Sequence, residues 1–168
     1  MEVPHQLTVK EIGELVAAYA KGAVRAKKAG LDFVEIHGAH GYLITQFLSP
    51  FSNRRTDAYG GTFEKRMRFL DEVYAAVRAA VGADFPVTLR LSGDEMVAGG
   101  LHLADTKRIA KRMERAGVDA LHVSAGNYTS YVRGFMIPPM AMPDAPLVAL
   151  AKGVKSVVNI PVIAVAKI

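Results

Sequence analysis

Ten residues set the pattern of this chain, and they read Val34-Glu35-Ile36-His37-Gly38-Ala39-His40-Gly41-Tyr42-Leu43. The stretch begins like a buried strand and then breaks at Gly38 and Gly41. Two histidines and a tyrosine stand where the strand ends. A helical pattern precedes the stretch, and further helices and strands follow it. We therefore expect one strand end at the functional edge of a parallel sheet.

Helical and strand patterns alternate four times along the chain. Thr8 and Glu11 form a capping box that predicts the start of the first helix. We expect helices over residues 9–29, 62–81, 104–116 and 147–158, and strands over 33–37, 87–91, 120–124 and 162–165. Strands that are separated by a helix pair in parallel with right-handed crossovers.

An internal repeat narrows the fold. The segment Ala29-Gly30-Leu31-Asp32 matches Ala116-Gly117-Val118-Asp119, and Phe85-Pro86-Val87 matches Ile160-Pro161-Val162. A repeated βα unit favours an α/β fold of the (β/α)8 TIM barrel type, which has eight units in about 250 residues. The 168 residues hold four units, so we expect residues 1–168 to form a single partial barrel domain, or half-barrel. The alternative is an open, flavodoxin-like parallel sheet.

The composition is that of an ordinary globular domain, with 51% hydrophobic and 22% charged residues. Net charge is +5, but the basic residues are spread over helices, so we expect no nucleic-acid partner. The chain has no cysteine, which excludes disulfides and thiolate chemistry within it. No apolar run approaches the ~20 residues of a membrane span, and residues 1–10 lack a signal-peptide layout. We expect a cytoplasmic protein without a membrane partner.

Polar side chains recur on one face of otherwise apolar strands. In barrels the reacting groups come from the carboxyl ends of strands, and buried polar groups are costly without partners. Their recurrence at all four strands predicts a functional site. Counting alternate residues gives the inward-facing set Glu35, His37, Thr88, Arg90, His122, Ser124, Ala166 and Lys167.

Arg90 offers a planar fork of donors that suits a carboxylate, a phosphate or the electron-rich edge of a heterocycle. An ion pair with Glu35 or Glu95 is the structural alternative. His37 and His40 could be two ligands of one metal, but no third ligand stands at a convincing spacing, so we expect no metal site. As neutral donors the two histidines could polarise a substrate carbonyl, and the Tyr42 phenol could act as a general acid. Packing within the loop is the alternative for Tyr42.

Several stretches along the chain together carry a resemblance to a known family. They are the opening stretch, Gln46-Phe47-Leu48-Ser49-Pro50, Asn53-Arg54-Arg55-Thr56-Asp57-Ala58-Tyr59-Gly60-Gly61-Thr62, Glu64, Arg66, Arg68, Phe69 and Pro86-Val87-Thr88-Leu89-Arg90-Leu91-Ser92. With them the sequence closely resembles the Old Yellow Enzyme family of flavin oxidoreductases, and the match covers nearly the whole chain. Residues 119–126 and 160–165 look most like the 2-enoate, 2,4-dienoyl-CoA and bile-acid reductase branch.

The resemblance implies an FMN-binding (β/α)8 barrel that takes hydride from NADH or NADPH and passes it to the β-carbon of an activated alkene. By resemblance His37 and His40 bind the carbonyl oxygen of an unsaturated carbonyl substrate, and Tyr42 protonates the α-carbon. Arg90 matches the arginine at the electron-rich edge of the flavin ring. Lys167 matches a residue of the phosphate site.

The resemblance covers only about strands four to seven of that barrel. Where the family usually has Val-Gly-Lys or Val-Gly-Arg, this chain reads Val165-Ala166-Lys167. We expect Ala166 to weaken FMN phosphate binding, and the isolated chain to bind FMN weakly or not at all. The chain would need the missing barrel half or would associate with itself as a homo-oligomer. Two other functions stay open, a catalytically silent self-associating half-barrel and a metal-dependent hydrolase.

Overall fold

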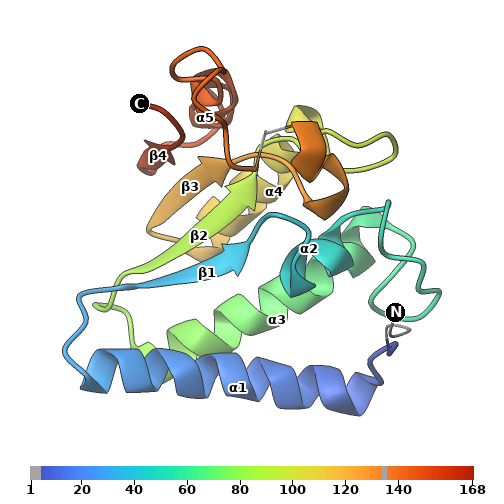
Figure 1. Ribbon diagram of the computed structural model, residues 1–168. Helices are drawn as coiled ribbons and strands as arrows, with labels where there is room; N and C mark the ends of the chain where they lie inside the picture. The colour runs from blue at the N-terminus through green and yellow to red at the C-terminus, as the bar shows by residue number, and fades with distance from the viewer. Residues whose placement is uncertain (1–4, 134–135) are drawn as a thin grey trace.

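The computed structural model describes residues 5–133 and 136–168, which form one parallel sheet with helices against it (Figure 1). The strands are β1 Val34–Gly38, β2 Val87–Ser92, β3 Ala120–Ser124 and β4 Val162–Ala164. The helices are α1 Val9–Lys28, α2 Leu43–Leu48, α3 Phe63–Val81, α4 Leu103–Ala116 and α5 Val148–Lys155, with a 3-10 helix, η1, at Tyr128–Arg133.

The helix boundaries follow local capping chemistry. Thr8 caps α1 by accepting the amide of Glu11, whose carboxylate accepts the amide of Thr8 at 2.7 Å. Thr62 caps α3 by accepting the amide of Lys65, without a reciprocal bond. Gly117 ends α4 in the left-handed conformation at φ 99°, which glycine adopts without a Cβ penalty. These capped helices deliver the chain to the start of each strand.

The strand order identifies the topology. The four strands pair in parallel in the order β1-β2-β3-β4. A flavodoxin-like sheet would place its first strand between the second and third. The alternative of an open flavodoxin-like sheet is therefore wrong, and the sequential order is that of consecutive units in a (β/α) barrel.

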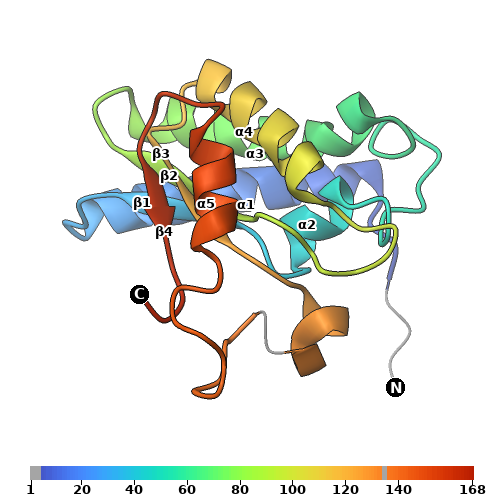
Figure 2. The ribbon, with the colours of Figure 1, turned by 90° about the horizontal axis from the view of Figure 1, so that it is seen from above.

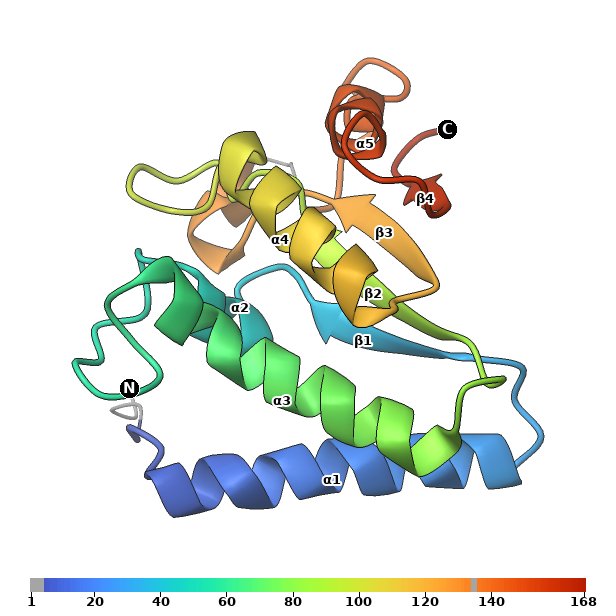
Figure 3. The same ribbon diagram turned by 180° about the vertical axis from the view of Figure 1, so that it is seen from behind.

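Helices cover one face of the sheet only. Seen from behind, α3 and α4 lie on the near side of the sheet and α1 lies below β1, alongside α3 (Figure 3), whereas the opposite face has no helix across β1, β2 and β3 (Figure 1). In the view from above, η1 lies on the opposite side of the sheet from α3 and α4 (Figure 2). The face without helices corresponds to the interior of a barrel.

The hydrophobic core lies between the sheet and this helical layer. Val87, Leu89 and Leu91 of β2 are at most 2% exposed, and Met67, Leu70 and Val73 of α3 are fully buried. Side chains alternate along a strand, so the residues between these apolar ones point to the other face. The core therefore fixes Thr88 and Arg90 on the interior face.

The elements agree with the expected ones apart from their ends and two additions. The first helix ends at Lys28 rather than at residue 29, and α5 ends three residues before the expected residue 158. The last strand ends at Ala164. Neither α2 nor η1 was expected, because both are six residues long and follow glycine-containing loops. None of the described helices combines the length and hydrophobicity needed to cross a membrane.

Candidate functional site

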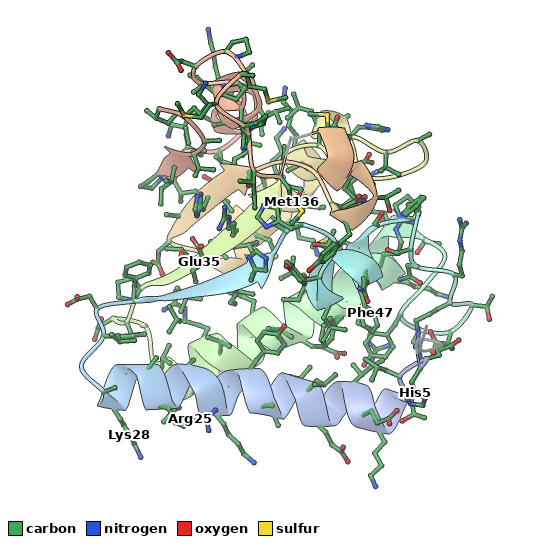
Figure 4. The ribbon with its side chains drawn as sticks, in the orientation of Figure 1. His5, Arg25, Lys28, Glu35, Phe47 and Met136 are labelled. Atoms are coloured by element: carbon green, nitrogen blue, oxygen red, sulfur yellow. The ribbon has the colours of Figure 1, made fainter. Side chains whose placement is uncertain are left out.

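The interior face of the sheet carries one row of polar side chains across three strands. The strand register places His37 opposite Arg90, Arg90 opposite His122, and His122 opposite Ile163 of β4. Glu35 lies one layer nearer the start of β1, opposite Thr88; Figure 4 marks its position on this strand. The inward-facing set expected on β1, β2 and β3 therefore shares one surface.

His37 and His40 lie close together, with ring centroids 5.1 Å apart. Burial and the positive charge of Arg90 lower the pKa of His37 below its ordinary value. The same two causes, burial first, lower the pKa of His40 to about 4. Both imidazoles are therefore neutral near pH 7 and can act as uncharged hydrogen-bond donors or acceptors.

His40 is held more firmly than His37. It adopts the left-handed conformation at φ 65° and is 7% exposed. Its amide donates to Ser92 Oγ at 3.0 Å, and its Nε2 lies 2.7 Å from Ser124 Oγ. His37 is half-buried. Of the two histidines, His37 is the one whose ring is more open to a ligand.

Tyr42 completes the cluster and brings a partner that the sequence did not reveal. Its ring lies 5.3 Å from that of His37, and its hydroxyl lies 2.8 Å from the hydroxyl of Tyr128. This hydrogen bond raises the pKa of Tyr128. Tyr128, an aromatic residue directly after Gly126-Asn127, was the only sign of this partner in the sequence. Its contact with Tyr42 depends on how the loop folds back.

A close approach of two loops creates this contact. His40 forms an isolated parallel bridge with Asn127, the residue before Tyr128. Gly41, which directly follows His40, has φ 78°, and a Cβ at that position would come within 3.1 Å of the Asn127 side chain. Glycine is therefore required here for both its conformation and its size.

Arg90 makes neither of the two ion pairs considered from the sequence. Glu35 instead accepts from His122 Nδ1 at 3.1 Å. Glu95 is buried and accepts from the Ser49 hydroxyl, from the amide of Leu101 and from the Asn127 side chain.

Two buried nitrogens on the interior face, Arg90 Nε and His122 Nε2, have no hydrogen-bond partner among the described residues. Unpaired buried polar atoms are rare in native proteins, and they point to a ligand or water that completes the site. A positively charged, planar donor group of this kind suits the electron-rich edge of a flavin ring.

The residues expected at the phosphate end lie apart from this row. Ala166 and Lys167 follow β4 and have φ values of 85° and 48°. Lys167 Nζ donates to the carbonyls of Met140 and Met142 and pairs with Asp144 at 3.3 Å. Ala166 occupies a conformation that glycine adopts more readily.

No group of three or more histidine, aspartate or glutamate side chains within residues 5–133 and 136–168 is placed to hold a metal ion. The hydrolase alternative therefore still rests on His37 and His40 alone.

Comparison with known proteins identifies the family. The model of the NADH:flavin oxidoreductase / NADH oxidase family matches residues 1–168. The chain is 51% identical over 162 residues to an NADH oxidase of Thermoanaerobacter brockii, covering 96% of this chain and 25% of that protein. It is 46% identical over 126 residues to an NADPH dehydrogenase of Halalkalibacterium halodurans, covering 75% of this chain and 37% of that protein.

Solved structures give the same answer. A 2-naphthoyl-CoA reductase complex superposes with a TM-score of 0.83 at 31% identity, covering 94% of this chain and 24% of that one. Morphinone reductase in complex with tetrahydroNAD superposes with a TM-score of 0.72 at 30% identity, covering 96% and 40%. The chain thus spans roughly a quarter to two fifths of these relatives. From its full-length match and its half-barrel fold, the chain belongs to the NADH:flavin oxidoreductase / NADH oxidase family, the FMN-using Old Yellow Enzyme family.

Proposed function

We propose that this chain carries the substrate side of an FMN-dependent NAD(P)H oxidoreductase that reduces the C=C bond of an α,β-unsaturated carbonyl compound. The observation that carries the proposal is the position of neutral His37 and the Tyr42 phenol at one strand end, beside Arg90, whose buried Nε has no hydrogen-bond partner among the described residues. Donors, a proton source and a fixed positive charge are the groups that such a reduction needs.

The proposed role of His37 is to bind the substrate carbonyl oxygen. Negative charge gathers on that oxygen as the alkene is reduced, and a neutral N–H donor stabilises it. Burial and Arg90 keep the ring of His37 uncharged by lowering its pKa. A preorganised donor of this kind is worth about 3 kcal/mol of barrier. His40 is fixed by Ser92 and Ser124 and would support or share this contact.

The proposed role of Tyr42 is to give its phenolic proton to the α-carbon. Bound FMN would supply the hydride that goes to the β-carbon, after reduction by NADH or NADPH. The Tyr128 hydroxyl, 2.8 Å away, can donate to the Tyr42 oxygen as it loses its proton. Tyr128 is 62% exposed and can exchange its own proton with solvent.

Residues of this chain would hold FMN at two places. Arg90 would face the flavin ring with its Nε, which has no partner in the described part of the chain, and Lys167 would contribute at the phosphate. Lys167 is engaged by Asp144 and two carbonyls, and Ala166 stands where the family usually has glycine. We therefore propose that most of the affinity for FMN comes from parts of the barrel beyond these four strands.

The substrate class follows from the chemistry and not from one named compound. Two similar structures are named for a CoA thioester, 2-naphthoyl-CoA, and for morphinone. A conjugated ketone and a conjugated thioester both offer a carbonyl oxygen for His37 and an α-carbon for Tyr42. Cytoplasmic location remains a prediction, to be checked by fractionating cells that make the protein.

Substitution of Tyr42 by phenylalanine tests the proposal. In the FMN-loaded protein, whether this chain or a longer one that contains it, Tyr42→Phe should slow alkene reduction by about 100-fold or more, the scale of general acid catalysis. Flavin reduction by NADH or NADPH should stay near the wild-type rate. Anaerobic stopped-flow measurement of each half-reaction gives both rates.

Tyr19→Phe is the matched control, because Tyr19 lies on α1, in the helical layer away from the site. It should change neither rate. Equal slowing of both half-reactions in Tyr42→Phe would rule out Tyr42 as the proton donor.

A second function is favoured by the two free edges of the sheet. β1 and β4 each have only one strand neighbour among the described residues, and free strand edges invite pairing with another chain. An apolar cavity of about 490 Å³ lies between α1 and β1, lined by Leu15, Tyr19, Val34, Ile36 and Leu43 among others. We propose, as the alternative, a catalytically silent half-barrel that associates with a second copy.

Light scattering on the purified chain measures its oligomeric state and so tests the self-associating alternative. Self-association should give a dimer or a larger species that binds no flavin. A stable monomer at all concentrations would argue against this alternative.

A further inference from the structure

The interior face holds one carboxylate among several cationic or potentially cationic groups. Glu35 shares this face with His37, Arg90 and His122. Arginine is always charged and binds carboxylates tightly in bidentate geometry. The simplest expectation is therefore a Glu35–Arg90 ion pair, yet the two side chains are not paired. Glu35 pairs with His122 instead.

His122 engages Glu35 with its Nδ1, which lies 3.1 and 3.2 Å from the two carboxylate oxygens. Nδ1–H donates to the carboxylate, and the Thr88 hydroxyl lies 3.4 Å from it on the strand between them. The His122 side chain is 16% exposed and the Glu35 side chain 26% exposed, although Glu35 as a whole residue is exposed on β1. Water therefore screens this pair in part, less than it screens a pair of fully exposed side chains.

Glu35 has the reach to bind Arg90 instead. It extends from β1 across β2 to meet His122 on β3, a span of two strand spacings, or about 10 Å. Arg90 is on the nearer strand, β2, and diagonal to Glu35 by two residues. Diagonal pairs of long side chains are within contact distance. The Glu35 carboxylate therefore has two possible partners and is bound to the more distant one.

The other carboxylate that could neutralise Arg90 is also engaged. Glu95 is 1% exposed, and Ser49, Leu101 and Asn127 donate to it. With both acids occupied, Arg90 keeps its full charge on the interior face and a buried Nε without a described partner.

We propose that His122 is a positioning residue that holds Glu35 away from Arg90, so that Arg90 stays free to bind the electron-rich edge of the flavin ring. The inference rests on the FMN cofactor of the proposed function. The inference adds to the proposed function a residue, His122, that preserves the positive charge facing FMN. Without His122, Glu35 would turn to Arg90, neutralise it and compete with the flavin for its donors.

A double-mutant cycle tests this idea through FMN affinity and reduction potential. The protein used is the FMN-binding one, either this chain or the longer protein that contains it. His122→Phe should weaken FMN binding by about tenfold or more, the scale of coupling between contacting charged residues. It should also make the reduction potential of bound FMN more negative. Glu35→Gln alone should leave both quantities near wild type.

The double variant His122→Phe with Glu35→Gln is the decisive one. It has no carboxylate to capture Arg90, so FMN affinity and potential should return to near the wild-type values. His102→Phe is the matched control, because His102 pairs with Asp94 at the same 3.1 Å distance at the start of α4. Thermal unfolding of each variant shows that the fold is kept.

The other possible results distinguish failure of the His122 inference from failure of the proposed function. If His122→Phe changes neither quantity, His122 does not protect Arg90, and the proposed function stands without it. If the double variant is as weak as His122→Phe, His122 acts by contact or packing and the inference is wrong. If neither this chain nor a longer protein that contains it binds FMN, the proposed function itself fails.

Discussion

At the residue scale, burial determines the charge state of the histidines on which the proposed chemistry depends. His40 combines a left-handed backbone, near-complete burial and a hydrogen bond to Ser124. Its burial, first, and the positive charge of Arg90 lower its pKa to about 4 from the ordinary 6.5. A pKa that differs between the folded and unfolded chain makes stability depend on pH.

Acid should therefore destabilise the protein between about pH 6.5 and pH 4. In this window the unfolded chain binds a proton at His40 that the folded chain does not, so the free energy of unfolding falls as pH falls. The contribution is full above pH 6.5, and up to about 3 kcal/mol is lost once pH passes below the folded pKa. Urea unfolding at a series of pH values measures this slope.

His40→Asn is the informative variant for this prediction, because asparagine tolerates the left-handed conformation. It should unfold with a clearly shallower pH dependence than the wild type. His102→Gln removes a histidine that is 53% exposed on its side chain and should leave the slope unchanged. The same slope in His40→Asn and wild type would show that His40 is not the residue responsible.

At the scale of elements, buried Glu95 ties together the loops that carry the site. Ser49 follows α2, Glu95 lies in the loop after β2, and Asn127 precedes η1. Ser49 and the Leu101 amide donate to Oε2 of Glu95, while the Asn127 side chain donates to Oε1 at 3.2 Å. Asn127 in turn adjoins His40 and Tyr128. A single carboxylate therefore supports the position of the Tyr42–Tyr128 pair.

Glu95→Gln should lower the free energy of unfolding by about 1–3 kcal/mol, the cost of leaving a buried donor unpaired. A glutamine oxygen can still accept from Ser49 and Leu101, but its amide would face the Asn127 amide, donor against donor. Asn127 cannot turn over, because its oxygen accepts from the amides of Thr129 and Ser130. Urea unfolding measures the loss.

The control for this prediction is Glu14→Gln on the surface of α1. Glu14 lies 3.8 Å from Lys10 in an exposed pair, and such pairs contribute little. The free energy of unfolding of the Glu14→Gln variant should stay within about 0.5 kcal/mol of the wild-type value. If Glu95→Gln is equally mild, the Glu95 contacts do not hold the loops together.

The elements that could be predicted from sequence are those with strong local signals. The capping box of Thr8, the glycine at 117 and the apolar runs of β1, β2 and β3 predicted their helices and strands to within two residues. The short α2 has an apolar pattern, but it is too short to show helical periodicity beside a glycine-rich loop.

Contacts between distant segments could not be predicted in the same way. Alternation along the strands predicted that Glu35, Arg90 and His122 share a face, and the register agrees. It could not tell whether Glu35 would pair with Arg90 or with His122, since both are within reach. The Tyr42–Tyr128 contact joins residues 86 positions apart and requires the folded loops.

At the scale of the whole molecule, the chain presents an unclosed barrel interior. Ile163, which continues the row of His37, Arg90 and His122, is 46% exposed, and Phe33 before β1 is 53% exposed. Apolar surface of this kind is normally covered, in a barrel by the remaining strands. The flavin site proposed here would have only part of its walls in these 168 residues.

The isolated 168-residue chain should therefore bind FMN weakly or not at all. Arg90 and Lys167 are its expected contacts, and Lys167 is already engaged by Asp144. Titration of FMN fluorescence with the purified chain measures the affinity. A stoichiometric yellow flavin in the purified chain would show that four strands are enough.

The most direct test of the proposed function is whether an activated alkene takes hydride from the reduced, FMN-loaded protein. In an anaerobic single-turnover experiment, 2-cyclohexenone is the test compound and cyclohexanone, which lacks the C=C bond, is the control. Because the proposed roles of His37 and Tyr42, whose rings lie side by side, are to bind a carbonyl and to give a proton, we expect 2-cyclohexenone, and not cyclohexanone, to reoxidise the flavin. The product should be the saturated ketone, formed one for one. Reoxidation by oxygen, but by neither a conjugated enone nor a conjugated enoyl thioester, would contradict the proposed function.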